Sequence, residues 1–149
     1  MIEKTIVVGF TGSQSGLTVL QSNKLETLIA HLKPVEAHHG GCIGADDSFH
    51  QCCLKFEIRV HLHPGCDKFG NKPKVGKWTE EDKCIVVINE TKWYLERNMD
   101  IVDACNILIA CPKGPEERRS GTWSTVRYAK KSKKNIIILY PDGTYESIF

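Results

Sequence analysis

The chain has 149 residues, a length typical of one domain, and its 20 basic and 18 acidic side chains leave a formal charge of +2 at pH 7. This near balance excludes a basic field over the whole surface, so any contact with nucleic acid must be local. No apolar stretch approaches the roughly 20 residues of a membrane-spanning helix, so we expect a cytoplasmic protein without membrane contact. The seven cysteines are an odd number, and we expect reduced thiols because four lie in or beside apolar runs (Cys42, Cys53, Cys84 and Cys105).

The N-terminal part of the chain has the pattern of a strand, a loop and a helix. Residues 5–10 form a short, β-branched and almost entirely apolar run, which is typical of a strand covered on both faces. A loop rich in glycine and hydroxyls follows at residues 11–16. Apolar side chains then recur on one stripe of a helix over residues 17–32, which Pro34 ends because it has no N–H.

The same pattern continues in the next segment. A second strand is predicted at residues 35–39, followed by a glycine-rich loop at 40–47. A helix is predicted from about residue 46 to 55, and Asp46 or Asp47 is expected to cap it. A third strand is predicted at residues 58–63.

The middle of the chain is less regular. Residues 64–83 are charged and punctuated by glycine and proline, and a loop of this length in a compact domain is usually functional or mobile. Residues 84–88 resemble a strand, and the sequence leaves open whether they form an edge strand or a loop packed on the sheet.

The C-terminal third alternates again between helices and apolar strands. Repeated alternation of this kind predicts one α/β domain over residues 1–149, with a single doubly wound, mainly parallel sheet and helices on both faces. The helices are expected at about residues 94–105 and at 122–131, and the strands at 107–110 and 135–140, with a turn at 141–143.

Three loops meet the carboxyl edge of such a sheet, where parallel folds bind their ligands. They span residues 11–16, 40–47 and 111–122, and they share glycines, hydroxyls and helix starts. Glycine lets the backbone approach a phosphate, and the positive end of the helix dipole favours an anion. The sequence therefore predicts an anion or nucleotide pocket at this edge.

Two common nucleotide sites are disfavoured. The glycines of residues 40–46 follow the second strand and differ from the Gly-x-Gly-x-x-Gly fingerprint, which follows the first strand, so an NAD-dependent dehydrogenase is not expected. The chain also lacks a Gly-Lys-Ser or Gly-Lys-Thr loop, so nucleoside triphosphate hydrolysis has no support.

Charged side chains near the predicted pocket allow two interpretations each. Arg97 is the first candidate for a phosphate or carboxylate ligand, because its guanidinium can form two parallel hydrogen bonds; alternatively it pairs on the surface with Glu96 or Asp100. Arg119 either closes over a phosphate or is solvated. Glu96 could serve as a general base if it is buried near a sugar, and Asp46 could bind ribose hydroxyls.

His61, His63 and Cys66 invite a metal interpretation, since alternate side chains of a strand project to one face. A fourth ligand is not evident, so no metal is assigned, and the strand end is expected to place His63 near the mouth of the pocket.

Four sequence blocks, spread over nearly the whole chain, resemble the SLOG superfamily. This Rossmann-like group includes LOG-type phosphoribohydrolases and Smf-type DNA-processing proteins. The resemblance implies a nucleotide or nucleotide-derived ligand, with its phosphate at the helix start of residues 120–122, and a homodimer. The blocks are residues 11–13, 40–46, 96–98 and 120–122.

The chain departs from the LOG enzymes at one catalytic position. Arg97 matches their arginine, and Gly121 with Thr122 matches their Gly-Thr pair, but Thr125 stands where they carry glutamate. The chain therefore lacks the carboxylate that would stabilise oxocarbenium character, unless Glu96, Glu116 or Glu117 substitutes for it.

Single-stranded DNA binding, which the Smf-type resemblance implies, is the third candidate function. A lysine cluster at residues 130–134 makes a basic patch conceivable, but lysines at a helix end also suit the helix dipole. Trp123 shares helical spacing with Val126 and Ala129, so we expect it in the core or at a subunit interface rather than stacked on a base.

The leading hypothesis is a domain that binds a phosphate-bearing nucleotide or nucleotide-derived molecule, as a sensor or carrier. The alternative is an enzyme that releases base from a nucleoside monophosphate, with Arg97 and Glu96 as its catalytic residues. No cofactor is expected. The expected ligand-binding residues are Thr11, Gly12, Ser13, Gly40, Gly41, Gly44, Ala45, Asp46, Asn98, Pro112, Arg119, Ser120, Gly121 and Thr122.

Overall fold

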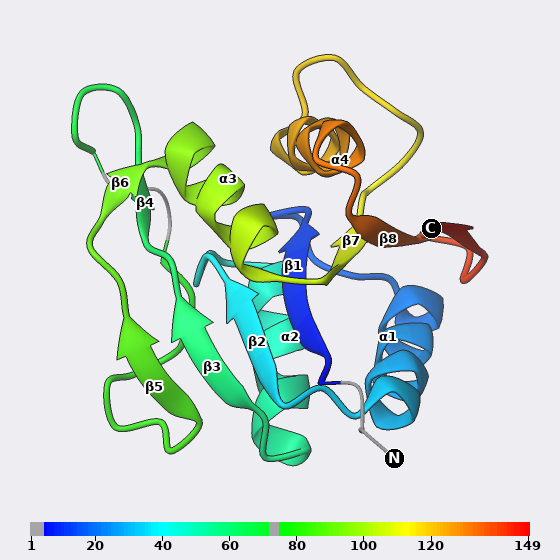
Figure 1. The fold of residues 1–149 in the computed structure, drawn as a ribbon, viewed down its shortest axis with the longest axis horizontal. Helices are drawn as coiled ribbons and strands as arrows, with labels where there is room; N and C mark the ends of the chain where they lie inside the picture. The colour runs from blue at the N-terminus through cyan, green and yellow to red at the C-terminus, as the bar shows by residue number, and fades with distance from the viewer. Residues whose placement is uncertain (1–4, 72–74) are drawn as a thin grey trace.

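A computed structural model, which describes residues 5–71 and 75–149, shows a seven-stranded sheet between two pairs of helices (Figure 1). The strand order is β5-β3-β2-β1-β7-β8-β9, and every pairing is parallel except that of β8 with β9. The predicted doubly wound α/β fold is therefore confirmed. The elements are β1 (Val7–Gly12), α1 (Val19–Leu32), β2 (Glu36–His39), α2 (Ala45–Lys55), β3 (Arg59–Leu62), β4 (Gly65–Cys66), β5 (Ile85–Ile88), β6 (Lys92–Trp93), α3 (Tyr94–Ala104), β7 (Ile107–Cys111), α4 (Gly121–Lys131), β8 (Asn135–Leu139) and β9 (Tyr145–Ile148).

Local hydrogen bonds set where α1 begins and ends. Thr18 closes a capping box with Gln21, which starts the helix two residues later than its apolar pattern suggests. Lys33 adopts the left-handed conformation directly before Pro34, so the helix stops where the proline predicted.

The start of α2 corrects a sequence-based expectation. Neither Asp46 nor Asp47 caps this helix, because Gly44 occupies the N-cap position without a side-chain hydrogen bond. Both carboxylates lie in the first turn and bind backbone N–H groups outside the helix. Asp46 accepts from the Cys42 N–H at 3.1 Å, and Asp47 accepts from the Lys77 N–H at 2.8 Å.

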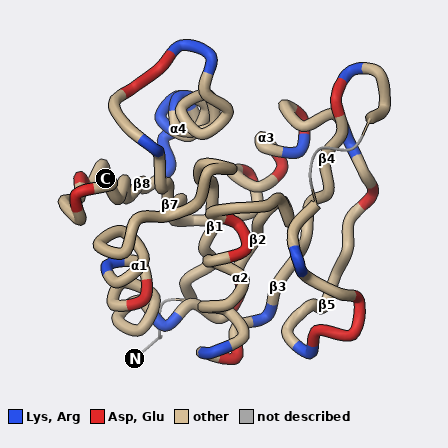
Figure 2. Tube along the Cα trace, turned by 180° about the vertical axis from the view of Figure 1, so that it is seen from behind, with Lys and Arg blue, Asp and Glu red and all other residues tan. Residues whose placement is uncertain are grey.

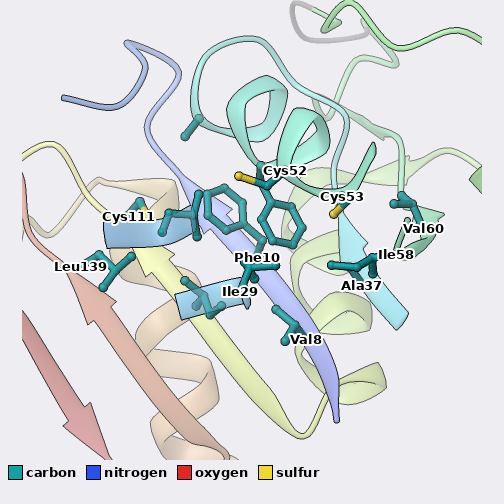
Figure 3. Close-up of a cluster of buried hydrophobic side chains, with 14 of the residues drawn as sticks. Val8, Phe10, Ile29, Ala37, Cys52, Cys53, Ile58, Val60, Cys111 and Leu139 are labelled. Carbon is teal, nitrogen blue, oxygen red and sulfur yellow. The ribbon is translucent and has the colours of Figure 1, made fainter. Parts of the chain in front are cut away.

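Two apolar layers pack on opposite faces of the sheet. On one face, α1 and α2 cover the strands, and Phe10 of β1 stacks on Phe49 of α2 with ring centroids 4.3 Å apart. Figure 3 shows Phe10 at the centre of this layer, with Cys52 and Cys53 of α2 beside it. On the other face, α3 packs on β1 and β2 and α4 packs on β7 and β8, and Trp123 lies in this core, as predicted.

The regions that the sequence left open are also assigned. Residues 85–88 form an edge strand parallel to β3, and the short strand β4 of the long connection pairs with β6. The antiparallel strand β9 was not predicted. All seven cysteines lie in the described part of the chain and are free thiols, and none of the described helices is long and apolar enough to cross a membrane.

Candidate functional site

A cavity of about 640 Å³ opens at the carboxyl ends of β1 and β7. The chain adds strands on one side of β1 up to β5 and then crosses to the other side with β7, so these strands flank the point where the strand order reverses. Open α/β sheets bind ligands at such a point. Eleven predicted residues line the cavity: Thr11, Gly12, Ser13, Gly40, Asp46, Arg97, Asn98, Arg119, Ser120, Gly121 and Thr122.

Arg97 is buried at the side of this cavity and is held by several acceptors. Its Nη1 donates to the Gly40 carbonyl at 3.3 Å and to the His63 carbonyl at 3.1 Å, and its Nε donates to Asn98 Oδ1 at 2.8 Å. The Cys42 sulfur lies 3.9 Å from both terminal nitrogens. These contacts fix the orientation of the guanidinium, and a pre-oriented guanidinium loses little entropy when it binds an anion.

Two glycines make room for this arginine. A Cβ on Gly40 or on Gly65 of β4 would lie 2.9 Å from Arg97 Cζ, a separation that a real Cβ does not tolerate. The first glycine of the residue 40–47 loop therefore serves the arginine directly, rather than a close approach of ligand to backbone.

The start of α4 faces the same cavity. The Ser120 hydroxyl accepts from the Trp123 N–H at 3.2 Å and caps the helix. In the described part of the chain, the N–H groups of Gly121 and Thr122 have no hydrogen-bond partner, as expected for the first turn of a helix. This turn is suited to bind an anion, because it offers free N–H groups, the Thr122 side chain and the positive end of the helix dipole.

The start of α2, in contrast, is closed by the protein itself. The Ala45 N–H donates to the Ser13 carbonyl at 2.9 Å, and a Cβ on Gly44 would lie 2.8 Å from the same oxygen. The Gly41 N–H donates to His39 Nδ1, and its carbonyl accepts from the Trp78 indole. Gly41, Gly44 and Ala45, which were predicted to bind the ligand, therefore pack loops together and are not among the residues that line the cavity.

Two further predicted residues lie elsewhere. The Pro112 carbonyl accepts from the buried Gln21 amide at 2.9 Å, so this residue is turned towards α1 and is not part of the cavity lining. Glu96 is exposed on α3 and is also outside the lining, so the burial that a general base there required is not met.

Asp46 is the buried carboxylate of the cavity. Burial raises its pKa to about 6, although hydrogen bonds from the Cys42 and Gly40 N–H groups and the charge of Arg97 oppose the shift. The carboxylate therefore changes charge near neutral pH, within the group of residues that would meet a ligand.

The predicted site list did not include every residue of the lining. Lys113 and Glu117 lie on the β7–α4 connection, which was predicted as a pocket loop with Glu117 as a possible catalytic carboxylate, and on which Figure 2 shows charges of both signs. Arg127 of α4 braces this connection, because it donates to Glu116 Oε2 at 3.0 Å and to the Arg118 carbonyl at 3.0 Å. The other lining residues that were not named singly are Phe10, Gln14, Ser15, Cys42, Asp67, Asn71, Tyr94 and Ile101. Of these, Gln14, Ser15 and Cys42 lie in loops that were predicted to form the pocket.

The alternatives raised by the sequence are also placed. Thr125, at the position of the LOG glutamate, donates to the Gly121 carbonyl inside α4 at 2.9 Å and does not line the cavity. Lys134 of the lysine cluster is tied to the Cys105 carbonyl at 2.8 Å. The ring of His63 points to His38 and not to Cys66: its Nε2 lies 2.7 Å from His38 Nδ1.

The fold is similar to a solved structure described as that of the molybdenum cofactor binding protein from the phototrophic bacterium Rippkaea orientalis. The comparison gives a TM-score of 0.63 at 22% sequence identity and covers 92% of this chain and 77% of that chain. No protein-family model and no curated protein matches the chain. At this identity, the likeness establishes the Rossmann-like α/β fold that the chain shares with that protein.

Proposed function

We propose that this chain binds a phosphate-bearing nucleotide or nucleotide-derived molecule at the carboxyl ends of β1 and β7, as a carrier or sensor. The observation that supports this most strongly is that the open first turn of α4 and the buried guanidinium of Arg97 line one cavity. Free backbone N–H groups and a fixed cation are complementary to a phosphate. A volume of about 640 Å³ also falls within the usual range for small-molecule sites, about 300 to 1,000 Å³.

The structural neighbour and the sequence motifs support the same class of function. The neighbour is described as a molybdenum cofactor binding protein, which agrees with a small-molecule carrier role for this chain. The SLOG-like blocks of residues 96–98 and 120–122 both contribute to the cavity, through Arg97 and Asn98 and through Ser120 to Thr122. A SLOG-type binding domain is therefore the family assignment that we propose.

A nucleotide N-glycosidase is the second candidate, and one observation favours it. Of the three glutamates that could replace the missing LOG carboxylate, Glu117 lines the cavity, whereas Glu96 lies outside the lining and Glu116 pairs with Arg127. Release of free base from nucleoside monophosphates by the native protein, lost in Glu117→Gln, would replace the carrier role with this activity.

A matched pair of threonines on α4 tests the binding proposal. Thr122 lines the cavity, whereas the Thr125 hydroxyl is bonded inside the helix, and valine has nearly the same shape as threonine. In thermal-shift assays with a panel of nucleoside monophosphates, we expect stabilisation of the native protein and of Thr125→Val. Thr122→Val should bind about ten- to a hundredfold more weakly, which corresponds to one hydrogen bond to a charged group. The proposal fails if no nucleotide stabilises the native protein, or if the two variants respond alike.

A further inference from the structure

A cluster of two histidines and one glutamate lies on the face of the sheet that α3 and α4 cover in part. His38 of β2 and His61 of β3 are partners in the parallel ladder, and Glu36 precedes His38 by two residues. Because alternate residues of a strand project to the same face, the three side chains converge there. Beyond α3, strands β3 and β5 continue to the edge of the sheet (Figure 1). This histidine cluster (Glu36, His38 and His61) is separate from the residues that line the cavity.

The donor atoms of the histidine cluster are close together. Glu36 Oε2 lies 2.9 Å from His38 Nε2, and Glu36 Oε1 lies 2.9 Å from His61 Nε2. All three ligand atoms fall within 4.8 Å of one another. Tetrahedral zinc with bonds of about 2.0–2.1 Å separates its ligand atoms by about 3.3 Å, so small side-chain rotations suffice to admit an ion.

We propose that Glu36, His38 and His61 bind a divalent transition metal ion, Zn²⁺ by preference, with solvent in the remaining position. Two imidazole nitrogens and one carboxylate oxygen suit zinc and its first-row neighbours, whereas calcium and magnesium prefer oxygen ligands alone. His38 is buried, with its side chain 5% exposed, but Glu36 and His61 are 29% and 22% exposed. The exposed side of the histidine cluster therefore leaves room for a water ligand.

His63 supports the proposal because it contacts the ring nitrogen of His38 that does not face Glu36. A histidine that binds metal through one ring nitrogen usually donates the N–H of its other nitrogen to a neighbouring group. His38 Nδ1 lies 2.7 Å from His63 Nε2, so His63 accepts that hydrogen bond when His38 Nε2 holds the metal and the His63 proton is on Nδ1. Asn89 Nδ2, 3.5 Å from His63 Nδ1, then makes no hydrogen bond to that nitrogen.

The neighbouring charges also suit a cation. The histidine cluster contains one carboxylate, that of Glu36. Asp100 of α3 adds little negative charge, because it is paired with Lys92 Nζ at 2.7 Å. Arg59 is a positive charge on the same face of β3, two residues before His61, and it is the ladder partner of Glu36. The Glu36 carboxylate nevertheless points to the two histidines, with which it is paired. The proposal does not depend on the nucleotide cavity, so metal binding can be measured in the absence of any nucleotide.

The test measures binding of Zn²⁺ by equilibrium dialysis and of Co²⁺ by its visible absorption. We expect the native protein to bind one ion, and His61→Gln to bind at least about tenfold more weakly, since even loss of an outer-shell partner costs about ten- to a hundredfold. His31→Gln is the matched control, because His31 is an exposed histidine of α1 outside the histidine cluster. Circular dichroism and thermal melts report whether each variant is folded, and Glu36→Gln is the second variant if His61→Gln is not.

Thiolate binding is the main competing outcome, and the cobalt spectrum distinguishes it. Cysteine ligands add an intense sulfur-to-cobalt charge-transfer band, which a site of two imidazoles and a carboxylate lacks. The proposal is overturned if the native protein binds no ion, if that band appears and is lost in Cys66→Ser, or if folded His61→Gln and Glu36→Gln both retain native affinity.

Discussion

Gly40 lies directly against the guanidinium of Arg97, where a Cβ would come within 2.9 Å of Arg97 Cζ. The Gly40 carbonyl also accepts a hydrogen bond from Arg97 Nη1 at 3.3 Å. Gly40 thus makes space for the Arg97 guanidinium and also accepts a hydrogen bond from it. The contact between these two residues connects the loop of residues 40–47 to the candidate phosphate site.

Gly40→Ala should displace Arg97. The backbone of Gly40 is outside the left-handed region, so alanine is conformationally acceptable and the effect is steric. We expect a loss of about 1 to 3 kcal/mol in the free energy of unfolding, typical of overpacking, together with weaker nucleotide binding. The control is Gly114→Ala, because a Cβ at Gly114 meets nothing within 4 Å. Urea denaturation of the two variants provides the comparison, and equal stability would show that Gly40 is not needed for the packing of Arg97.

Arg97→Lys keeps the positive charge but loses the geometry. A lysine ammonium cannot reproduce the donors that bind the Gly40 and His63 carbonyls and Asn98 while also facing a ligand. We expect affinity for a nucleoside monophosphate, measured by calorimetry, to fall at least about tenfold, or about 1.4 kcal/mol. The matched exposed variant Arg59→Lys should bind as the native protein does. Native affinity in folded Arg97→Lys would mean that this guanidinium does not contact the ligand.

The buried Asp46 predicts a specific dependence of stability on pH. Its pKa is about 6 in the folded chain against an ordinary value of 3.8, so between these values the folded state binds more protons than the unfolded state. The contribution of Asp46 to stability is therefore present at low pH and is lost as pH rises through about 6. The full loss is roughly 3 kcal/mol for a shift of about two units.

Asp46→Asn measures this contribution because asparagine stays neutral and its Oδ1 can still accept from the Cys42 N–H. The contributions of the other titrating groups to the free energy of unfolding cancel when the variant is compared with the native protein at each pH. The variant should gain stability relative to the native protein, by up to roughly 3 kcal/mol, between about pH 4 and pH 7. If the difference in the free energy of unfolding between Asp46→Asn and the native protein is the same at every pH, the pKa of Asp46 is not raised.

Thr18→Ala should destabilise α1 through its cap. The Thr18 hydroxyl accepts from the Gln21 N–H at 3.0 Å and donates to the Pro141 carbonyl at 2.6 Å. Loss of such a cap costs about 1 kcal/mol. Thr27→Ala is the comparison on the same helix, since that hydroxyl is bonded to the Asn23 carbonyl within α1 and is not at the cap. A smaller midpoint shift in thermal melts for Thr18→Ala than for Thr27→Ala would refute the capping role.

Much of the fold was predictable because buried parallel strands are nearly continuous apolar runs. The runs at residues 5–10 and 107–110 correspond to β1 and β7, and the loops after them line the cavity because parallel strands end at one edge. Strand β9 was missed because its residues, 145–148, are mostly exposed and lack apolar alternation. Its pairing with β8 depends on the preceding turn rather than on its own hydrophobic pattern.

Gly41 and Gly44 lie outside the cavity lining for a common physical reason. Glycine after a strand permits close approach, but the sequence does not show whether a ligand or another loop makes that approach. At Gly44 the neighbour is the loop of residues 13–14, and at Gly41 it is Trp78, far away in sequence. The histidine cluster was missed for a related reason, because the pairing of His38 with His61 depends on strand register.

If the first turn of α4 binds the phosphate of a nucleotide, the backbone amides of Gly121 and Thr122 report on that binding directly. The measurement is their chemical shifts in heteronuclear NMR spectra during titration with a nucleoside monophosphate and, separately, with the matching nucleoside. We predict that both amide resonances shift with the monophosphate and remain nearly unchanged with the nucleoside, since hydrogen bonds to the phosphate cause the shift. Equal shifts with both compounds, or no shift at saturating monophosphate, would show that this turn does not bind the phosphate.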